Sequence, residues 1–243
     1  MKRAFLAVMV FVSSVQLARA DKTGFVGNLV LEPPNCEAAG LCTLGEDFGF
    51  MDPQGIGWQT KKGDKTDGAS IPGWAQPFVG KPFEPAYIKA AVIHDHYCDR
   101  HVRAWKETHR VFFDALMASG VSSDLADLLY GAVYLGGPRW RDTIPGIKCP
   151  VGKQCVENVP KPAPEGTSAQ LTDEGKTVLF RPEQYTSPEF STRQAQLTAF
   201  IKSHPEGVSP EQIAQAADQI FPDKLFSVET PFVLEANPGT KDK

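Results

Sequence analysis

The sequence predicts an α+β fold, in which a small N-terminal antiparallel β-sheet packs against a three-helix segment and a mostly helical C-terminal appendage follows. Short runs of aromatic and β-branched residues between turn formers, such as GFVGNLVLE and EDFGFMD, indicate strands within residues 24–60. Residues 85–136 have helical periodicity, interrupted by glycines and by changes of composition. Two further helical patterns follow a proline-rich connection, which is typical of an extended linker.

The first twenty residues have the pattern of an export signal. Lys2 and Arg3 form a basic start, residues 4–17 are apolar, and the small-residue sequence ARA precedes Asp21. The apolar run is shorter than the roughly twenty residues of a membrane-spanning helix. We therefore expect no stable transmembrane span and a periplasmic or secreted protein.

We divide the chain into four predicted parts. They are a signal peptide (1–20), an α+β domain (21–145), a Cys/Pro-rich linker (146–170) and a C-terminal appendage (171–243). The chain is acidic, with 25 Lys and Arg against 29 Asp and Glu, and removal of the leader would take away three of the basic residues. Nucleic acids and anionic membrane surfaces need a basic face, so we expect no nucleic-acid partner.

Five cysteines in a chain with an export signal favour disulfides. Cys36 and Cys42 flank one short loop, and Cys149 and Cys155 flank another with the same offset. We predict one local disulfide in each pair. Cys98 then remains as a thiol.

Three consecutive helices are predicted over residues 85–103, 105–119 and 122–136. Beyond the linker, helices are predicted over 191–204 and 210–220. The last of these begins with the sequence SPEQ. Its serine suits the N-cap, its proline the first helical position, and its glutamine can close a capping box.

Titratable side chains are concentrated at the end of the first of these helices, in the sequence HDHYCDRH that begins at His94. The residues just before His94 are almost all apolar, so His94 and Asp95 are expected to face inward. A buried carboxylate needs a cation, a hydrogen-bond donor or a metal. His109 lies on the next helix among aromatic residues, and an antiparallel hairpin would bring it toward His94.

Asp67, in the polar loop before the first helix, adds a third candidate ligand. We predict that Asp67, His94 and His109 bind a divalent metal such as zinc. His94 and Asp95 are the predicted catalytic residues, with Asp95 as a general base or as the group that orients a metal-binding histidine.

Each of these residues also has a purely structural explanation. Asp67 before a glycine is a common turn residue, His94 and Asp95 can form a satisfied buried pair, and His109 can be a packed core histidine. The neighbouring side chains are expected to be structural, with His96, Asp99 and His101 at the surface and Cys98 as a small buried residue. A serine nucleophile at Ser70 is disfavoured because the GxSxG elbow is missing.

Four motifs occur in a fixed order: TDGASIPGW (66–74), AAVIHDHYC (90–98), THRVFFDALMASGV (108–121) and YGAVYLGGPRW (130–140). Over about residues 45–142 the chain thereby resembles a bacterial and phage-associated family, the domain-of-unknown-function family numbered 1353. The family tends to read His-Asp-x-x-Tyr, whereas Cys98 stands at the tyrosine position, and it often has aspartate where this chain has His109. An exchange of aspartate for histidine preserves a class of metal ligand.

These patterns lead to two expectations about function. The first is an exported metal-assisted hydrolase that acts on an envelope substrate, either peptidoglycan or lipid. The second is a non-catalytic envelope or phage-derived interaction module, in which the same residues form a buried His/Asp hydrogen-bond network.

Overall fold

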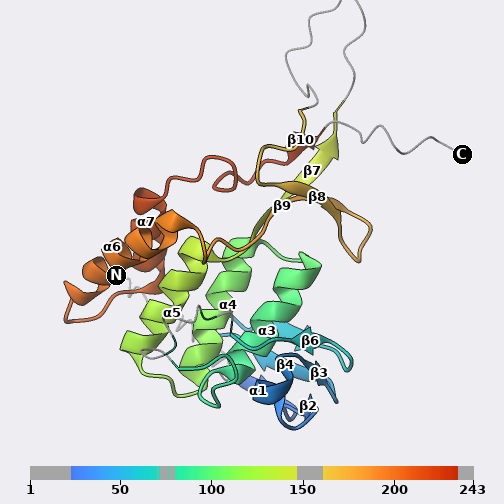
Figure 1. The fold of residues 1–243 in the computed structure, drawn as a ribbon, viewed down its shortest axis with the longest axis vertical. Helices are drawn as coiled ribbons and strands as arrows, with labels where there is room; N and C mark the ends of the chain where they lie inside the picture. The colour runs from blue at the N-terminus through green and yellow to red at the C-terminus, as the bar shows by residue number, and fades with distance from the viewer. Residues whose placement is uncertain (1–22, 70, 72–75, 77–79, 147–160, 235–243) are drawn as a thin grey trace, which may run out of the picture.

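The computed structural model describes residues 23–69, 71, 76, 80–146 and 161–234 (Figure 1). The predicted signal peptide, Ser70 and the predicted pair Cys149 and Cys155 lie outside the described residues. The predicted α+β class is confirmed, because small sheets are combined with a central group of helices. Within the described part, none of the helices has the length and hydrophobicity that a bilayer span requires.

Two small antiparallel sheets form the N-terminal part. One has the order β1-β4-β5 and the other the order β2-β3-β6. In β5 buried and exposed residues alternate, as expected for a strand with one face on the core. The bounds are β1 (Gly24–Val26), β2 (Leu31–Glu32), β3 (Cys42–Leu44), β4 (Phe48–Met51), β5 (Gly57–Thr60) and β6 (Lys65–Thr66).

The short helix α1 (Cys36–Ala39) connects β2 to β3. The predicted disulfide between Cys36 and Cys42 is confirmed, with the two Cα atoms 5.4 Å apart. It ties the start of α1 to the start of β3.

The three predicted central helices are confirmed as α3 (Ile88–Arg100), α4 (Trp105–Ala118) and α5 (Ser123–Gly136). They pack side by side, and the two N-terminal sheets lie against α3 and α4 (Figure 1). Their apolar faces share one core with Phe48, Phe50 and Trp58 of these sheets. The α3 helix is shorter than predicted, because His101 adopts the left-handed conformation, with φ 55°, and ends it.

The C-terminal part is built onto the central helices. Its helices α6 (Pro188–Lys202) and α7 (Pro210–Ile220) pack against α5, as Figure 1 shows. The predicted capping box between Ser209 and Gln212 is confirmed. A second hydrophobic core joins residues of α4 and α5 to Leu197 and Ile213.

A four-stranded sheet of order β10-β7-β9-β8 links the two halves of the chain. Strand β7 pairs with β9 antiparallel and with β10 parallel. The C-terminal residues are therefore not only helical, and β8 begins inside the predicted linker. The bounds are β7 (Arg139–Pro145), β8 (Ser168–Leu171), β9 (Thr177–Arg181) and β10 (Phe232–Leu234). The predicted domain boundary near residue 145 stays a prediction.

His101 is buried, contrary to the surface position expected for it. Its ring packs against Trp140 and Phe180, with both ring centroids 4.9 Å away. Its Nε2 atom has no hydrogen-bond partner among the described residues. Burial lowers the pKa of His101 from 6.5 to about 4.

This histidine should make stability depend on pH. The pKa of His101 is lower in the folded chain than in the unfolded chain, so the unfolded chain takes up the proton first as the pH falls. The contribution of His101 to stability is therefore complete above pH 6.5 and declines as the pH falls toward 4. Between pH 7 and pH 5 we expect a loss of about 2 kcal/mol from this residue. His101→Asn keeps a residue that tolerates positive φ and should remove that part of the pH dependence. Urea unfolding at both pH values measures it, and an unchanged pH dependence in the variant would contradict the assignment.

Candidate metal centre

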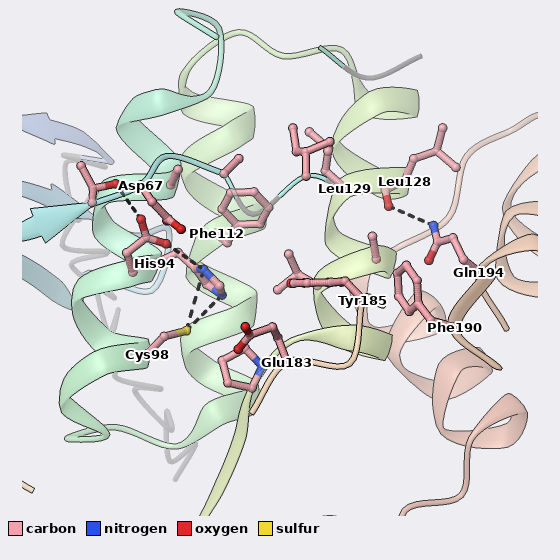
Figure 2. Close-up of a pocket in the computed structure, with 18 of the residues that line it drawn as sticks. Asp67, His94, Cys98, Phe112, Leu128, Leu129, Glu183, Tyr185, Phe190 and Gln194 are labelled. Atoms are coloured by element: carbon pink, nitrogen blue, oxygen red, sulfur yellow. Dashed lines mark hydrogen bonds and ion pairs between the residues drawn. The ribbon is translucent and has the colours of Figure 1, made fainter. Parts of the chain in front are cut away.

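A cavity of about 590 Å³ lies between the central helices and the segment that leads into α6 (Figure 2). One end is polar and is lined by residues of α3, of the loop after β6 and of the loop after β9. The other end is lined mainly by apolar side chains of α5 and by Phe190, Gln194, Thr198 and Lys202 of α6. The polar lining includes Asp67, His94, Asp95, Cys98, Asp99 and Glu183.

Two histidines from neighbouring helices meet beside this cavity. His94 on α3 and His109 on α4 are both buried, and His94 Nε2 lies 2.9 Å from His109 Nδ1. The helical hairpin thus brings together two residues that are fifteen positions apart in the chain, as the sequence predicts. The ring of Phe112 packs against that of His94, with the two ring centroids 5.1 Å apart.

Cys98 joins the two histidines. It follows His94 by one helical turn, which puts both on one face of α3, and its Sγ lies 3.4 Å from His94 Nε2. One ligand atom from each of His94, Cys98 and His109 lies within 4.8 Å of the others. Cys98 is also the free cysteine among the described residues. This set of three side chains is hereafter called the His-Cys-His cluster.

The second nitrogen of each histidine faces an acceptor or the backbone. His94 Nδ1 lies 3.8 Å from Asp95 Oδ1, and Thr66 Oγ1 donates a hydrogen bond of 2.7 Å to Asp95 Oδ2. His109 Nε2 lies against the backbone at Gly137 and Pro138. His109 Nε2 makes no hydrogen bond there that meets the usual distance and angle limits.

Burial dominates the electrostatics of the cluster. It lowers the pKa of His109 well below its ordinary value, and the charges of His94 and Arg139 add to this, whereas the backbone of Pro138 opposes it. Burial also raises the pKa of the Cys98 thiol, and nearby carboxylates, first Asp95, raise it further. Both side chains are therefore neutral at pH 7 when no cation is bound.

The carboxyl groups at the polar end repel one another. Burial and then the charge of Asp95 raise the pKa of Asp67. For Asp99, partial burial of the carboxyl group, followed by the charges of Asp95, Asp67 and Asp64, raises the pKa to about 6. A cation at this end of the cavity would relieve the repulsion.

Of the predicted metal ligands, His94 and His109 are in contact, and Asp67 is outside the group of ligand atoms within 4.8 Å of one another. Asp67 lines the same cavity but is not a member of the His-Cys-His cluster, and Cys98 takes the third position instead. Asp67 as a ligand, and His94 and Asp95 as catalytic residues, stay predictions. The i to i+4 spacing of His94 and Cys98 is the sequence signal that identifies the third member.

The predicted surface position is confirmed for Asp99 and wrong for His96. Asp99 is exposed, as expected, whereas His96 is buried, contrary to its expected surface position. His96 lies two residues after His94 and so on another side of α3, where its Nδ1 is 2.5 Å from Asp64 Oδ2. Burial, as the largest cause, lowers the pKa of His96. This residue contributes to packing against β6 and not to the cavity.

Residues 42–133 match the family described as Protein of unknown function (DUF1353). The resemblance predicted from the four motifs is thereby confirmed over these residues. No solved structure matches the chain.

Two curated proteins of Sinorhizobium fredii (strain NBRC 101917 / NGR234) are similar to parts of the chain. Uncharacterized protein y4iH is 60% identical over 120 residues, which is 49% of this chain and 50% of that protein. Uncharacterized protein y4jT is 35% identical over 155 residues, which is 60% of this chain and 46% of that protein. The chain thus spans about half the length of these relatives.

Proposed function

We propose that this protein is an exported metal-assisted hydrolase, with a divalent ion such as zinc bound by His94, Cys98 and His109. The observation that carries the proposal is the convergence of these three side chains beside a large cavity. A site with three protein ligands and an open position toward a cavity is the pattern of catalytic zinc. The disulfide between Cys36 and Cys42 supports a periplasmic or secreted location, where envelope components are the proposed partners.

Two distances in the cluster are close to those around a tetrahedral ion, and the third, between Cys98 and His109, is within 4.8 Å. With ordinary zinc bond lengths, two ligand nitrogens lie about 3.3 Å apart and a nitrogen and a sulfur about 3.6 Å apart. Cys98 Sγ lies 3.4 Å from His94 Nε2, close to that value. His94 Nε2 and His109 Nδ1, 2.9 Å apart, need to separate by only about 0.4 Å.

The surroundings of the cluster also suit a metal. Histidine ligands usually donate their second N–H to a carboxylate or a backbone carbonyl, which fixes the ring and the tautomer. For His94 the neighbouring carboxylate is that of Asp95, which is 3.8 Å away and so beyond hydrogen-bond distance in the ion-free protein, and Thr66 holds Asp95. The backbone at Pro138 lies near the second nitrogen of His109.

The roles of the side chains follow from these positions. A bound zinc ion supplies a Lewis acid that polarises a carbonyl and makes water more acidic. We assign to Asp95 the orientation of His94, because one of its oxygens lies on the side of His94 and the other accepts from Thr66. Asp67 lines the open side of the cavity, and we assign to it the proton transfer with water.

One observation favours the second candidate, a non-catalytic interaction module. At 2.9 Å, His94 and His109 form a direct hydrogen bond without any ion. Cys98 is within reach of the same ring, so a neutral network that fixes α3 against α4 accounts for the contacts as well.

Metal binding separates the two candidates. We expect the purified full chain to bind one zinc ion, and to gain about 2.7 kcal/mol of stability when free zinc is 100-fold above its Kd. Substitution by cobalt should give a thiolate-to-metal absorption band that disappears in Cys98→Ser. Asp95→Asn should weaken zinc binding about 10- to 100-fold.

His204→Gln is the matched control, because His204 lies at the end of α6 and its Nδ1 contacts the carbonyl of Phe200. It should bind zinc and cobalt like the unmodified protein. A folded chain that binds neither ion, and whose melting temperature does not respond to a chelator, would exclude the hydrolase and support the network.

A further inference from the structure

The cavity beside the His-Cys-His cluster has two chemically different ends (Figure 2). Two members of the cluster, His94 and Cys98, line one end together with the nearby carboxylates, and His109 lies behind them. The opposite wall consists of apolar side chains of α5 together with Phe190 of α6, and it continues to the polar side chains of Gln194, Thr198 and Lys202 on α6. Gln194 lies well away from His94 and Cys98 in Figure 2. This wall is formed by Leu128, Leu129, Ala132, Val133 and Phe190.

The apolar wall is held in place by a close approach between α5 and the segment that leads into α6. A Cβ atom added to Gly136 would lie 2.5 Å from the ring of Phe190 and 2.7 Å from that of Tyr185. Phe190 is itself only 3% exposed. The apolar end is therefore preformed, and its 590 Å³ cavity falls within the usual range for small-molecule sites, about 300 to 1,000 Å³.

The charges at the polar end restrict what can enter. Asp67, Asp95, Asp99 and Glu183 line the cavity there, and they outnumber the two cationic residues of the whole lining, Lys65 and Lys202. In the metal-free protein these carboxylates would repel a phosphate or carboxylate head group at this end. A neutral or cationic head group meets no such barrier.

We propose that the substrate is a single-chain acyl ester or amide with a neutral or cationic head group. Its hydrocarbon chain lies along α5 and α6, and its carbonyl carbon reaches the His-Cys-His cluster. This inference rests on the proposed hydrolase function, and it favours a lipid over peptidoglycan as the envelope substrate.

The reaction is a hydrolysis without any change of oxidation state. The oxygen of water forms a bond to the carbonyl carbon, and the bond from that carbon to the alcohol oxygen or amine nitrogen breaks. Asp67 takes one proton from the water and returns it to the leaving oxygen or nitrogen. The products are a free fatty acid and an alcohol or amine.

Binding is tested first, on the metal-free full chain, so that nothing is hydrolysed. The probes are monodecanoylglycerol, decyltrimethylammonium and decanoate, which are neutral, cationic and anionic, measured by calorimetry below their micelle concentrations. We expect the first two to bind and decanoate to bind at least tenfold more weakly. Within the neutral series, affinity should rise about fourfold per added methylene until the cavity is full.

Chain-length selectivity is tested next, on the zinc-loaded protein with para-nitrophenyl acetate and para-nitrophenyl decanoate. We expect kcat/KM to be higher for the decanoate. Ala132→Trp puts a large ring into the apolar end and should lower the decanoate-to-acetate ratio at least tenfold. Leu171→Trp changes a residue that is 74% exposed on β8 and should leave the ratio unchanged.

The outcomes separate the two proposals. Binding of the neutral and cationic chains to a protein that takes up no metal would keep the acyl-chain site and exclude the hydrolase. Metal binding with equal kcat/KM for both esters, or tight binding of decanoate, would exclude the acyl-chain substrate and leave the metal site intact.

Discussion

Asp223→Asn is expected to lower the free energy of unfolding by about 3 to 5 kcal/mol, because it removes one partner of a buried ion pair. Asp223 Oδ2 accepts a hydrogen bond of 2.8 Å from Arg139 and a second bond from Arg181. Burial alone would raise the pKa of Asp223, but the two guanidinium groups lower it below its usual value. Asparagine would leave both arginines without a counter-charge. Urea unfolding at pH 7 measures the effect.

The size of this effect follows from where the arginines lie. Arg139 is 1% exposed, and its guanidinium group stacks 4.5 Å from the ring of Trp105. It has no route to water when Asp223 loses its charge. Asp173→Asn is the matched control, since Asp173 pairs with Arg100 at the surface and is 65% exposed. That variant should lose at most about 1 kcal/mol, and equal losses in the two variants would refute the buried pair.

The same ion pair bears on how the chain is organised. Arg139 starts β7 at the end of the central helices, whereas Asp223 lies after α7 in the predicted appendage. A large loss of stability in Asp223→Asn would show that the C-terminal residues unfold together with the central helices. If Asp223→Asn instead produced a separate unfolding transition at lower temperature and left the main transition unchanged, the C-terminal residues would unfold independently of the central helices.

Local sequence signals are enough to predict the helices and the contact between His94 and His109. The apolar run before His94 and the aromatic residues around His109 fix which faces of α3 and α4 turn inward. A short hairpin then places the two histidines together, and the SPEQ sequence gives the capping box of α7. Each of these features depends on residues within a few turns of one another.

The rest of the site depends on contacts that local patterns do not encode. Glu183 and Tyr185 reach the cavity from a loop after β9, and their neighbours in sequence show no periodicity that indicates a wall. Their position is set by the pairing of β7 with β9 and by the glycines at the end of α5. The surface positions predicted for His96 and His101 are wrong for a related reason. Strands that are distant in sequence cover these sides of α3 and bury both side chains.

Gly137→Ala is expected to disturb the His-Cys-His cluster, because Gly137 lies against His109. Gly137 follows α5 with φ −69° and ψ 166°, a conformation that alanine adopts freely, so backbone strain plays no part. An added Cβ would lie nearest to the backbone carbonyl oxygen of Val133, in the last turn of α5, and 2.8 Å from His109 Nε2. The imidazole must therefore move, and it cannot move far because His109 is completely buried.

We expect Gly137→Ala to lower the free energy of unfolding by about 1 to 3 kcal/mol, as overpacking of a core usually does. If His109 is a metal ligand, the variant should also lose zinc affinity and the cobalt-thiolate band should shift, because the ring can no longer meet His94 and Cys98. Gly57→Ala is the control, since its new Cβ would meet only the end of Met51, at 3.8 Å. A Gly137→Ala protein with unchanged stability and an unchanged cobalt spectrum would mean that the close approach of Gly137 does not fix His109, and that the geometry of the cluster is set by α3 and α4 alone.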